Sequence, residues 1–374
     1  MAASLHDRLA EALLAALRAQ PWNQARDRRR GGLPFTHPPS IDLAVAVLPS
    51  DAPPAWANVL MSREHPQGFV ARIGDDAGPV QDLAFLADPV DAAGVSVAWQ
   101  PGADWSGIAF APLYGSGTRR FVAPYPASLV KLMVAVAVAR LCDAGRAAWD
   151  EPWRHGAVTQ TPAQWCEPML TVSDNDATDA LVALLHARGA IGGGADGRPD
   201  AHHEAHALFA AQGLPTLRLA RTTPAGGWRN ADGSGVGALQ MTAWDTVRLL
   251  WRLLDVPAPW LPPGSPPMLT ADSRQRMWRW LCDQQLNEVL SSRSLVGVPG
   301  WRAGIDVGFA HKTGTTETYA SDAGLFMPRP GLRVLVAVLT TLGRCAASDE
   351  RCATDWCVPA LGAAMQAAVC DIWR

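Results

Sequence analysis

The stretch PASLVKLM, residues 126–133, decides how this chain is interpreted. It contains Lys131, one of only two lysines among 374 residues, whereas the chain has 30 arginines. The other lysine is Lys312, in FAHKTGTT at residues 309–316. Arginine stays protonated in proteins, but a lysine amine in a poorly solvated site can lose its proton. We therefore infer that these two positions need a property that Arg lacks.

Ser128 and Lys131 are three residues apart at the start of an expected helix. This spacing places both side chains on one helix face, about one turn apart. The following LMVAVAVA is apolar all round, so the helix should be deeply buried. A desolvated Lys amine can then act as the base that takes the proton of the Ser hydroxyl. The alternative is a chance quartet with Lys131 as a surface cation.

Two further motifs follow in order. Ser-Asp-Asn occupies residues 173–175, between two helical runs, and Lys-Thr-Gly occupies residues 312–314, at the end of a strand-like run. Together with Ser-x-x-Lys at 128–131, this is the signature of class A β-lactamases and penicillin-binding proteins. The chain therefore resembles a serine β-lactamase of class A type. The likeness extends through PAQWCEPMLTVSDNDATDALVALL, VPGWRAGIDVGFAHKTGTT and LRVLVAVLTT.

The resemblance is estimated to cover residues 41–374 and leaves 1–40 as an N-terminal helix and linker. It implies an α/β (α+β) fold of the serine β-lactamase/DD-peptidase type. An antiparallel sheet formed from both chain ends would be flanked by helices, with an α/β lobe at 41–127 and 293–374. An all-helical lobe at 128–292 would be inserted between them. Strand patterns occur at 41–48, 94–99, 107–111, 305–312, 321–327 and 332–341, helical periodicity dominates from 128 to about 290, and a closing helix begins near Pro359.

The resemblance also implies catalytic roles. Ser128 would be the acylated nucleophile, and Lys131 would help to remove its proton. Ser173 would relay a proton to the leaving nitrogen, while Lys312 would set the electrostatics around Ser173 and a substrate carboxylate.

The remaining carried-over positions would bind substrate. Asn175 would hydrogen-bond the substrate amide, and Thr313 would contact the carboxylate. The backbone N–H groups of Ser128 and Thr315 would form the oxyanion hole. Gly314 and Thr223 complete the expected substrate-binding set.

Thr223 is the main departure from the family. Class A β-lactamases place a glutamate before a proline to activate the water that releases the acyl-enzyme. The matching LRLARTTPAGGW has Pro224 in place but Thr223 where the glutamate should be. A threonine hydroxyl is no general base at neutral pH, so efficient β-lactam hydrolysis by the usual route is not expected.

The arginine that commonly anchors a substrate carboxylate is also not obvious. Asp322 lies near its expected place, and Arg344 or Arg351 are possible substitutes. The stretch between Ser128 and Ser173 also looks shorter than in the family. The substrate class is therefore left open.

The composition is that of a folded chain with a sizeable core, because 48% of its residues are apolar and 18% are charged. The net charge of −3 gives no reason to expect a nucleic-acid or membrane partner. HHEAH at 202–206 offers two histidines at i, i+4 spacing without an evident third ligand, so we expect no metal and no other cofactor. The expected partner is a small-molecule or peptide-like substrate, and the oligomeric state is left open.

Leu5, Leu9, Leu13 and Leu17 recur every four residues, which favours an amphipathic helix over a signal peptide. Seven scattered cysteines are typical of free thiols in a reducing compartment. We therefore expect a cytoplasmic protein, or a periplasmic one if the start codon is mis-assigned.

The leading hypothesis is a serine hydrolase or acyltransferase that cleaves an amide, lactam or ester through an acyl-Ser128 intermediate and is a poor β-lactamase. One alternative is an acyl-binding pseudoenzyme without turnover. Another is a glutaminase-like or DD-peptidase-like amidase; the intact Lys-Thr-Gly disfavours a glutaminase.

Overall fold

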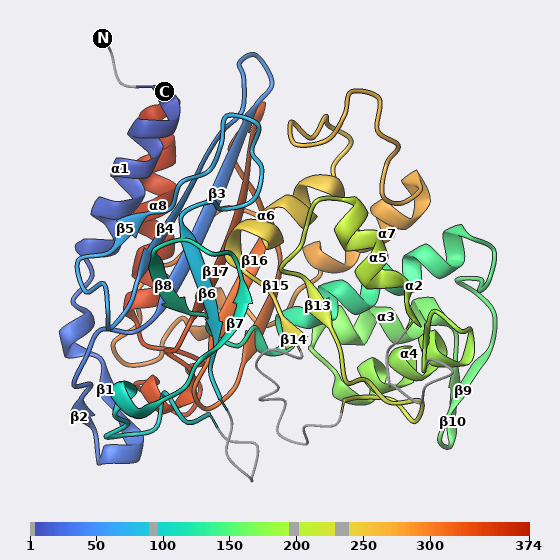
Figure 1. The fold of residues 1–374 in the computed structure, drawn as a ribbon, viewed down its shortest axis with the longest axis horizontal. Coiled ribbons are helices and arrows are strands. Elements are labelled where there is room, and N and C mark those ends of the chain that lie inside the picture. Colours follow the sequence, from blue (N-terminus) through green and yellow to red (C-terminus); the bar gives the residue numbers. More distant parts are fainter. Residues whose placement is uncertain (1–3, 90–95, 194–201, 229–238) are drawn as a thin grey trace.

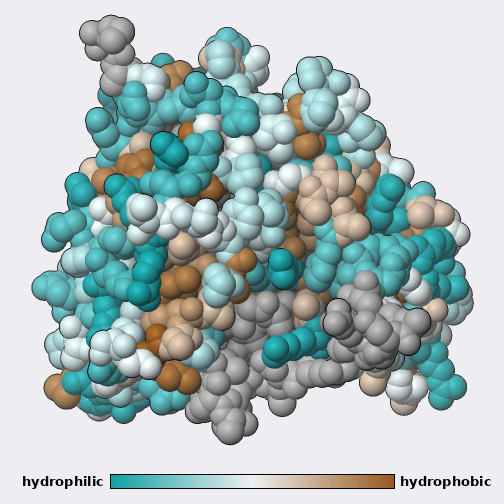
Figure 2. All heavy atoms as spheres, viewed as in Figure 1, coloured by the Kyte–Doolittle hydropathy of each residue, from teal (hydrophilic) through white to brown (hydrophobic). Residues whose placement is uncertain are grey.

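The computed structural model describes residues 4–89, 96–193, 202–228 and 239–374 and places them in a mixed α/β fold (Figure 1). One six-stranded sheet forms the centre of the α/β part, and a cluster of helices lies beside it. On the face seen in Figure 2, polar residues predominate and apolar residues gather in small groups. Within the described residues, no helix combines the length and apolar character needed to cross a membrane.

The six-stranded sheet is antiparallel throughout and is built from both ends of the chain, as expected. The strands at residues 41–49 and 332–340 come from opposite ends of the chain and lie side by side. They are buried on both faces, which explains their continuous apolar sequences. The strand order across the sheet is β15 (Phe309–Thr315), β16 (Ala320–Arg329), β17 (Leu332–Thr340), β3 (Ile41–Pro49), β4 (Ala55–Met61) and β5 (Phe69–Val70).

Helices cover both faces of this sheet. On one face, α1 (Leu5–Arg18) packs against β4 and against α8 (Cys357–Ile372), and the two helices lie side by side in Figure 1. Three of the four regularly spaced leucines of α1 are fully buried there, which explains their period. On the other face, α6 (Ala243–Arg252) lies against β3 and β17.

The helical lobe agrees with the periodicity of the sequence. The helix that follows the nucleophile motif is buried all round from residue 132 to residue 139, because several helices of the lobe pack on it. The lobe contains α2 (Lys131–Asp143), α3 (Pro162–Thr171), α4 (Asn175–Ala187), α5 (Glu204–Ala211) and α7 (Ala271–Cys282).

The strands expected at 94–99 and 107–111 are wrong for the residues that the structure describes. Residues 98 and 99 belong to a turn, and a 3-10 helix occupies Trp105–Gly107, where the Asp104 side chain accepts a hydrogen bond from Ser106 N. Pro101 and Gly102 interrupt the region, so its apolar runs are short. Residues 94 and 95 lie outside the described residues.

A smaller three-stranded sheet lies next to this region. Its order is β7 (Ala111–Tyr114), β6 (Leu83–Ala87) and β8 (Arg119–Val122), with β6 and β8 parallel. The remaining short strands form two-stranded pairs: β1 (Arg26–Asp27) with β2 (Leu33–Pro34), β9 (Trp153–His155) with β10 (Val158–Gln160), β11 (Ile191–Gly192) with β12 (His202–His203), and β13 (Arg218–Leu219) with β14 (Leu239–Gln240).

Candidate active site

Ser128 lies in a 3-10 turn, Ala127–Val130, that continues directly into α2. The preceding Ala127 has φ of 51°, a left-handed conformation that is uncommon for a residue with a Cβ and is often found at functional sites. Ser128 is half-buried, whereas Lys131 at the start of α2 is buried. The helical backbone continues from Ser128 to Lys131, and residues three apart on a helix share a face.

This nucleophile turn is fixed to the sheet. The Ser321 hydroxyl on β16 donates to the carbonyl of Pro126 at 2.6 Å. Gly314 on β15 lies so close to the turn that an added Cβ would be 2.6 Å from both Pro126 O and Leu129 N. The glycine of the Lys-Thr-Gly motif is therefore required by close packing, and Ser321 is a contributor that sequence reasoning missed.

The Ser-Asp-Asn motif forms the corner between α3 and α4. Asp174 is the N-cap of α4, and its carboxylate accepts a hydrogen bond from Ala177 N at 2.8 Å. Ser173 has φ of 61°, which turns the chain sharply between the two helices. The cap and the turn together direct Ser173 and Asn175 towards the start of α2.

Lys131 connects the first motif to the second. Its side chain is buried, and its Nζ donates to Ser173 O at 2.6 Å, to Asn175 Oδ1 at 2.7 Å and to Asp174 O at 3.2 Å. The same Nζ lies 3.3 Å from Ser173 Oγ. All three residues of the Ser-Asp-Asn corner are therefore held by one lysine.

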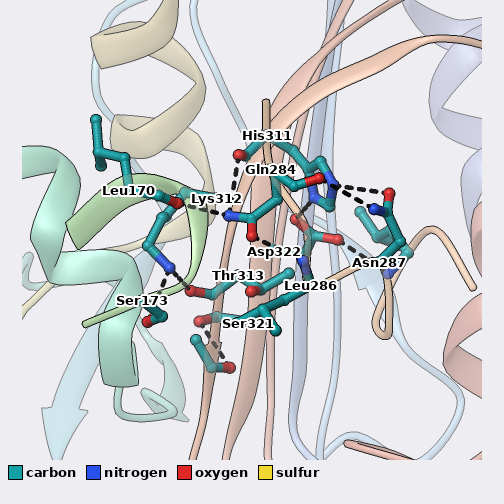
Figure 3. Close-up of polar contacts among 12 residues, drawn as sticks. Leu170, Ser173, Gln284, Leu286, Asn287, His311, Lys312, Thr313, Ser321 and Asp322 are labelled. Carbon is teal, nitrogen blue, oxygen red and sulfur yellow. Dashed lines mark hydrogen bonds and ion pairs between the residues drawn. The ribbon is translucent and has the colours of Figure 1, made fainter. Parts of the chain in front are cut away.

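Lys312 approaches the same corner from β15 (Figure 3). It is fully buried, and its Nζ donates to Ser173 Oγ at 3.0 Å and to Thr313 O at 2.7 Å. The only two lysines of the chain therefore converge on one hydroxyl oxygen, that of Ser173. The structure thus brings Lys131, Ser173, Asn175 and Lys312 together.

Burial shifts both amines towards the neutral form. It lowers the pKa of Lys131 to about 8, although the carboxylates of Asp174 and Asp179 oppose the shift. Burial also lowers the pKa of Lys312 well below its usual value, and the nearby charge of Lys131 lowers it further. Two adjacent buried amines disfavour simultaneous protonation, so one neutral amine beside the Ser173 hydroxyl is an accessible state near neutral pH.

His311, the residue before Lys312, forms a buried polar pair with Asp322, and the sequence did not predict this pair. The Nδ1 of His311 is 2.7 Å from Asp322 Oδ1, and both side chains are fully buried. Asp322 also accepts a hydrogen bond from Leu290 N at 3.0 Å, and His311 Nε2 lies 3.2 Å from Asn287 Oδ1 (Figure 3). Asp322 therefore pairs within the fold, where it fixes the strand that carries Lys312.

Of the two arginines considered as carboxylate anchors, only Arg344 adjoins the Lys-Thr-Gly strand. Its backbone N donates to Thr316 O at 2.9 Å, and the residue lines a groove of about 420 Å³. Arg344 and Lys312 both interact electrostatically with Glu288, whose pKa is raised by burial. The Arg351 side chain instead hydrogen-bonds Asp349.

The Thr223 hydroxyl is engaged inside its own loop. It donates to Gly226 O at 2.6 Å, and Thr223 N donates to Gly227 O at 3.0 Å. The neighbouring Thr222 Oγ1 is 2.9 Å from His186 Nε2. Nothing in these contacts gives residue 223 a basic group.

The histidines of HHEAH have structural contacts. His203 is the N-cap of α5, and its ring stacks on that of His206 at 3.6 Å between centroids. His206 Nε2 accepts a hydrogen bond from Leu219 N at 2.8 Å, so this nitrogen is already occupied. The part of the chain that the structure describes contains no group of three side chains suited to a metal ion.

The fold combines an antiparallel sheet with an adjoining helical lobe, and the Ser-x-x-Lys, Ser-Asp-Asn and Lys-Thr-Gly motifs lie where the two meet. This combination defines the serine β-lactamase class of proteins. A sequence model of the β-lactamase enzyme family matches residues 122–354, and the chain belongs to that family. None of the curated proteins matches the chain in sequence.

Solved structures share this fold at low sequence identity. PBP-A is 16% identical with a TM-score of 0.52, and the match covers 98% of this chain and 95% of that one. A variant of PBP-A, solved as an acyl-enzyme complex with penicillin G, is 15% identical with a TM-score of 0.52 and coverage of 98% and 96%. A class A β-lactamase representative from Bacteroides cellulosilyticus DSM 14838 is 13% identical, with a TM-score of 0.52 and coverage of 100% and 99%.

Proposed function

We propose that this protein is an active-site serine hydrolase or acyltransferase that cleaves an amide, lactam or ester through an acyl-Ser128 intermediate. The observation that carries the proposal is the convergence of Lys131 and Lys312 on the Ser173 hydroxyl. Lys131 follows the half-buried Ser128 by three residues, about one helical turn. Such a site can remove a proton from one hydroxyl and deliver a proton through another.

The proposed chemistry assigns a separate task to each side chain. Lys131, as a neutral amine, takes the Ser128 proton while Ser128 Oγ attacks the acyl carbon. Ser173 passes a proton to the leaving nitrogen or oxygen, and Lys312 stabilises the negative charge that develops nearby. The backbone N–H groups of Ser128 and Thr315 are the proposed oxyanion donors.

Substrate binding is proposed to involve the remaining motif residues. Asn175 would contact the substrate amide, and Thr313 and Gly314 would flank a substrate carboxylate with Arg344 as its anchor. The groove beside Arg344 is lined by Arg28 and Arg29 as well as by Glu317 and Glu350, so arginines outnumber acids there. This supports a substrate that carries a carboxylate.

Steady-state hydrolysis of a chromogenic cephalosporin and of an activated ester tests this proposal. We expect slow turnover of at least one substrate by the native chain and none above background by Ser128→Ala. Equal rates for the native chain and Ser128→Ala would contradict the proposal.

A second candidate, an acyl-binding protein without turnover, is favoured by one observation. Thr223 stands where the family keeps its glutamate, and its hydroxyl is committed to Gly226 O. A protein of this kind would form a lasting adduct on Ser128 and release no product.

A further inference from the structure

The loop that carries Thr223 lies directly on Asp179. An added Cβ on Gly226 would come within 2.5 Å of Asp179 O, and one on Gly227 would come within 2.9 Å of Asp179 Oδ1. Both glycines have positive φ, 102° and 68°. Two consecutive glycines therefore allow this loop to pass over the Asp179 carboxylate, a contact that no larger residue would permit.

Asp179 lies on α4, the helix that begins with Asn175 of the Ser-Asp-Asn motif. It follows Asn175 by four residues, so the two side chains share a helix face. The carboxylate is half-buried, and no hydrogen-bond donor among the described residues reaches it. A half-buried carboxylate without such a donor can hydrogen-bond to a water molecule.

The electrostatic surroundings of Asp179 suit a base. Burial raises its pKa, and Asp174 and Asp176 of the same segment raise it further. His155 on β9 and Lys131 on α2 oppose the shift, which also shows that Asp179 interacts with the lysine of the nucleophile motif. A carboxylate with a raised pKa is a better proton acceptor than an ordinary one.

We propose that the Asp179 carboxylate is the general base for release of the acyl group, in place of the glutamate that is absent at position 223. This proposal rests on the proposed acyl-Ser128 chemistry. Asp179 takes a proton from a water molecule as the water oxygen bonds to the acyl carbon. The bond from that carbon to Ser128 Oγ then breaks, Ser128 Oγ regains a proton, and a carboxylic acid leaves.

The test measures how long a β-lactam adduct persists on the intact protein. The native chain, Asp179→Asn and the control Asp176→Asn are acylated with a reactive β-lactam, free reagent is removed, and adduct loss is followed by mass spectrometry. Asp176 is an exposed acid three residues earlier on the same helix, so its substitution matches the charge change. We expect similar adduct formation in all three and a release rate about 10²–10⁴-fold lower in Asp179→Asn alone.

Two further measurements guard against a folding defect. Melting temperatures identify a variant that is not folded, and the pH profile of release in the native chain needs no variant. Release by a carboxylate base should fall as pH drops through the pKa of Asp179. Three results would overturn this inference alone. The first is an unchanged release rate in folded Asp179→Asn, and the second is a native release rate that does not fall at acidic pH. The third is an adduct that the native chain never releases. Absence of any adduct on the native chain would instead overturn the proposed function.

Discussion

Lys131 Nζ lies within hydrogen-bonding distance of four oxygen atoms, one more than an ammonium group has protons. An arginine fork is planar, longer and permanently protonated, so it fits neither the space nor the chemistry. Lys312 is constrained in the same way, because it is fully buried and its Nζ reaches Ser173 Oγ. The scarcity of lysine in the sequence thus pointed to the two amines that meet in the structure.

Lys131→Arg should slow acylation strongly while it retains the positive charge. Because the guanidinium cannot accept the Ser128 proton, we expect the acylation rate to fall about 10²–10⁴-fold. Stopped-flow mixing with a chromogenic cephalosporin measures this rate. Near-native acylation in Lys131→Arg would exclude Lys131 as the base.

The acylation rate should also depend on pH. The pKa of Lys131 is lowered to about 8, so its amine is mostly protonated below that pH and mostly neutral above it. Only the neutral form accepts a proton, and the rate should therefore rise with pH and level off above about 8. A rate independent of pH from about 6 to about 9 would contradict this assignment.

Sequence motifs identified the lysines and serines but missed Asp179, Ser321 and His311. Motif residues carry a recognisable spacing, whereas the contacts of these three residues depend on tertiary packing. Asp179 had one available signal, its four-residue spacing from Asn175 on a helix. Its position under the Thr223 loop depends on tertiary packing and leaves no local pattern.

At the scale of elements, the site depends on how closely β15 approaches the nucleophile turn. Gly314→Ala would place a Cβ 2.6 Å from backbone atoms of that turn, which must then move. We expect acylation to fall at least about tenfold and stability to fall by about 1–3 kcal/mol. Enzyme assays and thermal melting measure both effects.

Gly308→Ala is the matched control, because an added Cβ there meets nothing within 4 Å. It should retain native activity and stability. Equal behaviour of the two alanine variants would refute the packing argument for Gly314.

Asp42 on β3 couples the sheet to α6, because its carboxylate accepts hydrogen bonds from Asn58 Nδ2 at 2.7 Å and from Ala243 N at 2.9 Å. Burial raises its pKa from 3.8 to about 6. Between pH 3.8 and about pH 6, Asp42 therefore keeps its proton in the folded state but loses it in the unfolded chain. This contribution to stability is present at low pH and is lost as the pH rises through about 6.

Chemical denaturation of the native chain and Asp42→Asn across this pH range measures the effect. Relative to the variant, the native chain should lose about 2–3 kcal/mol of unfolding free energy between about pH 4 and about pH 7. A pH-independent difference between the two proteins would contradict the buried, proton-binding state of Asp42.

The sequence predicted the helices better than the strands. The helical runs in residues 128–290 carry long periodic signals, and the strands expected at 321–327 and 332–341 lie within β16 and β17. Between residues 94 and 111 the apolar runs are short and interrupted by Pro and Gly, so pattern alone assigned strands wrongly. β4 was missed because a seven-residue buried strand shows no alternation.

At the scale of the whole molecule, the site lies at the junction of the α/β part and the helical lobe. β15 supplies Lys312, the corner between α3 and α4 supplies Ser173, and α2 begins with Lys131. The division that leaves residues 1–40 as an N-terminal extension stays a prediction. Within that stretch, α1 packs against β4 and α8. No sequence pattern indicated that packing, since amphipathicity shows that a helix has a partner but not which one.

The groove beside Arg344 also involves the N-terminal segment, because Arg28 and Arg29 line it. Arg344→Ala should raise KM for a substrate with a carboxylate about tenfold or more, with a smaller effect on kcat, since one charged contact is lost. Arg351→Ala is the control, because Arg351 is exposed and bonded to Asp349. Equal KM values for both variants would remove Arg344 from substrate binding.

The most direct test of the acyl-enzyme account is peptide mapping by mass spectrometry after exposure of the native chain to a reactive β-lactam. The account predicts one covalent adduct, on the peptide that contains Ser128, and no adduct on Ser128→Ala. An adduct at another residue, or an unmodified native chain at reagent concentrations that acylate other members of the β-lactamase family, would contradict it.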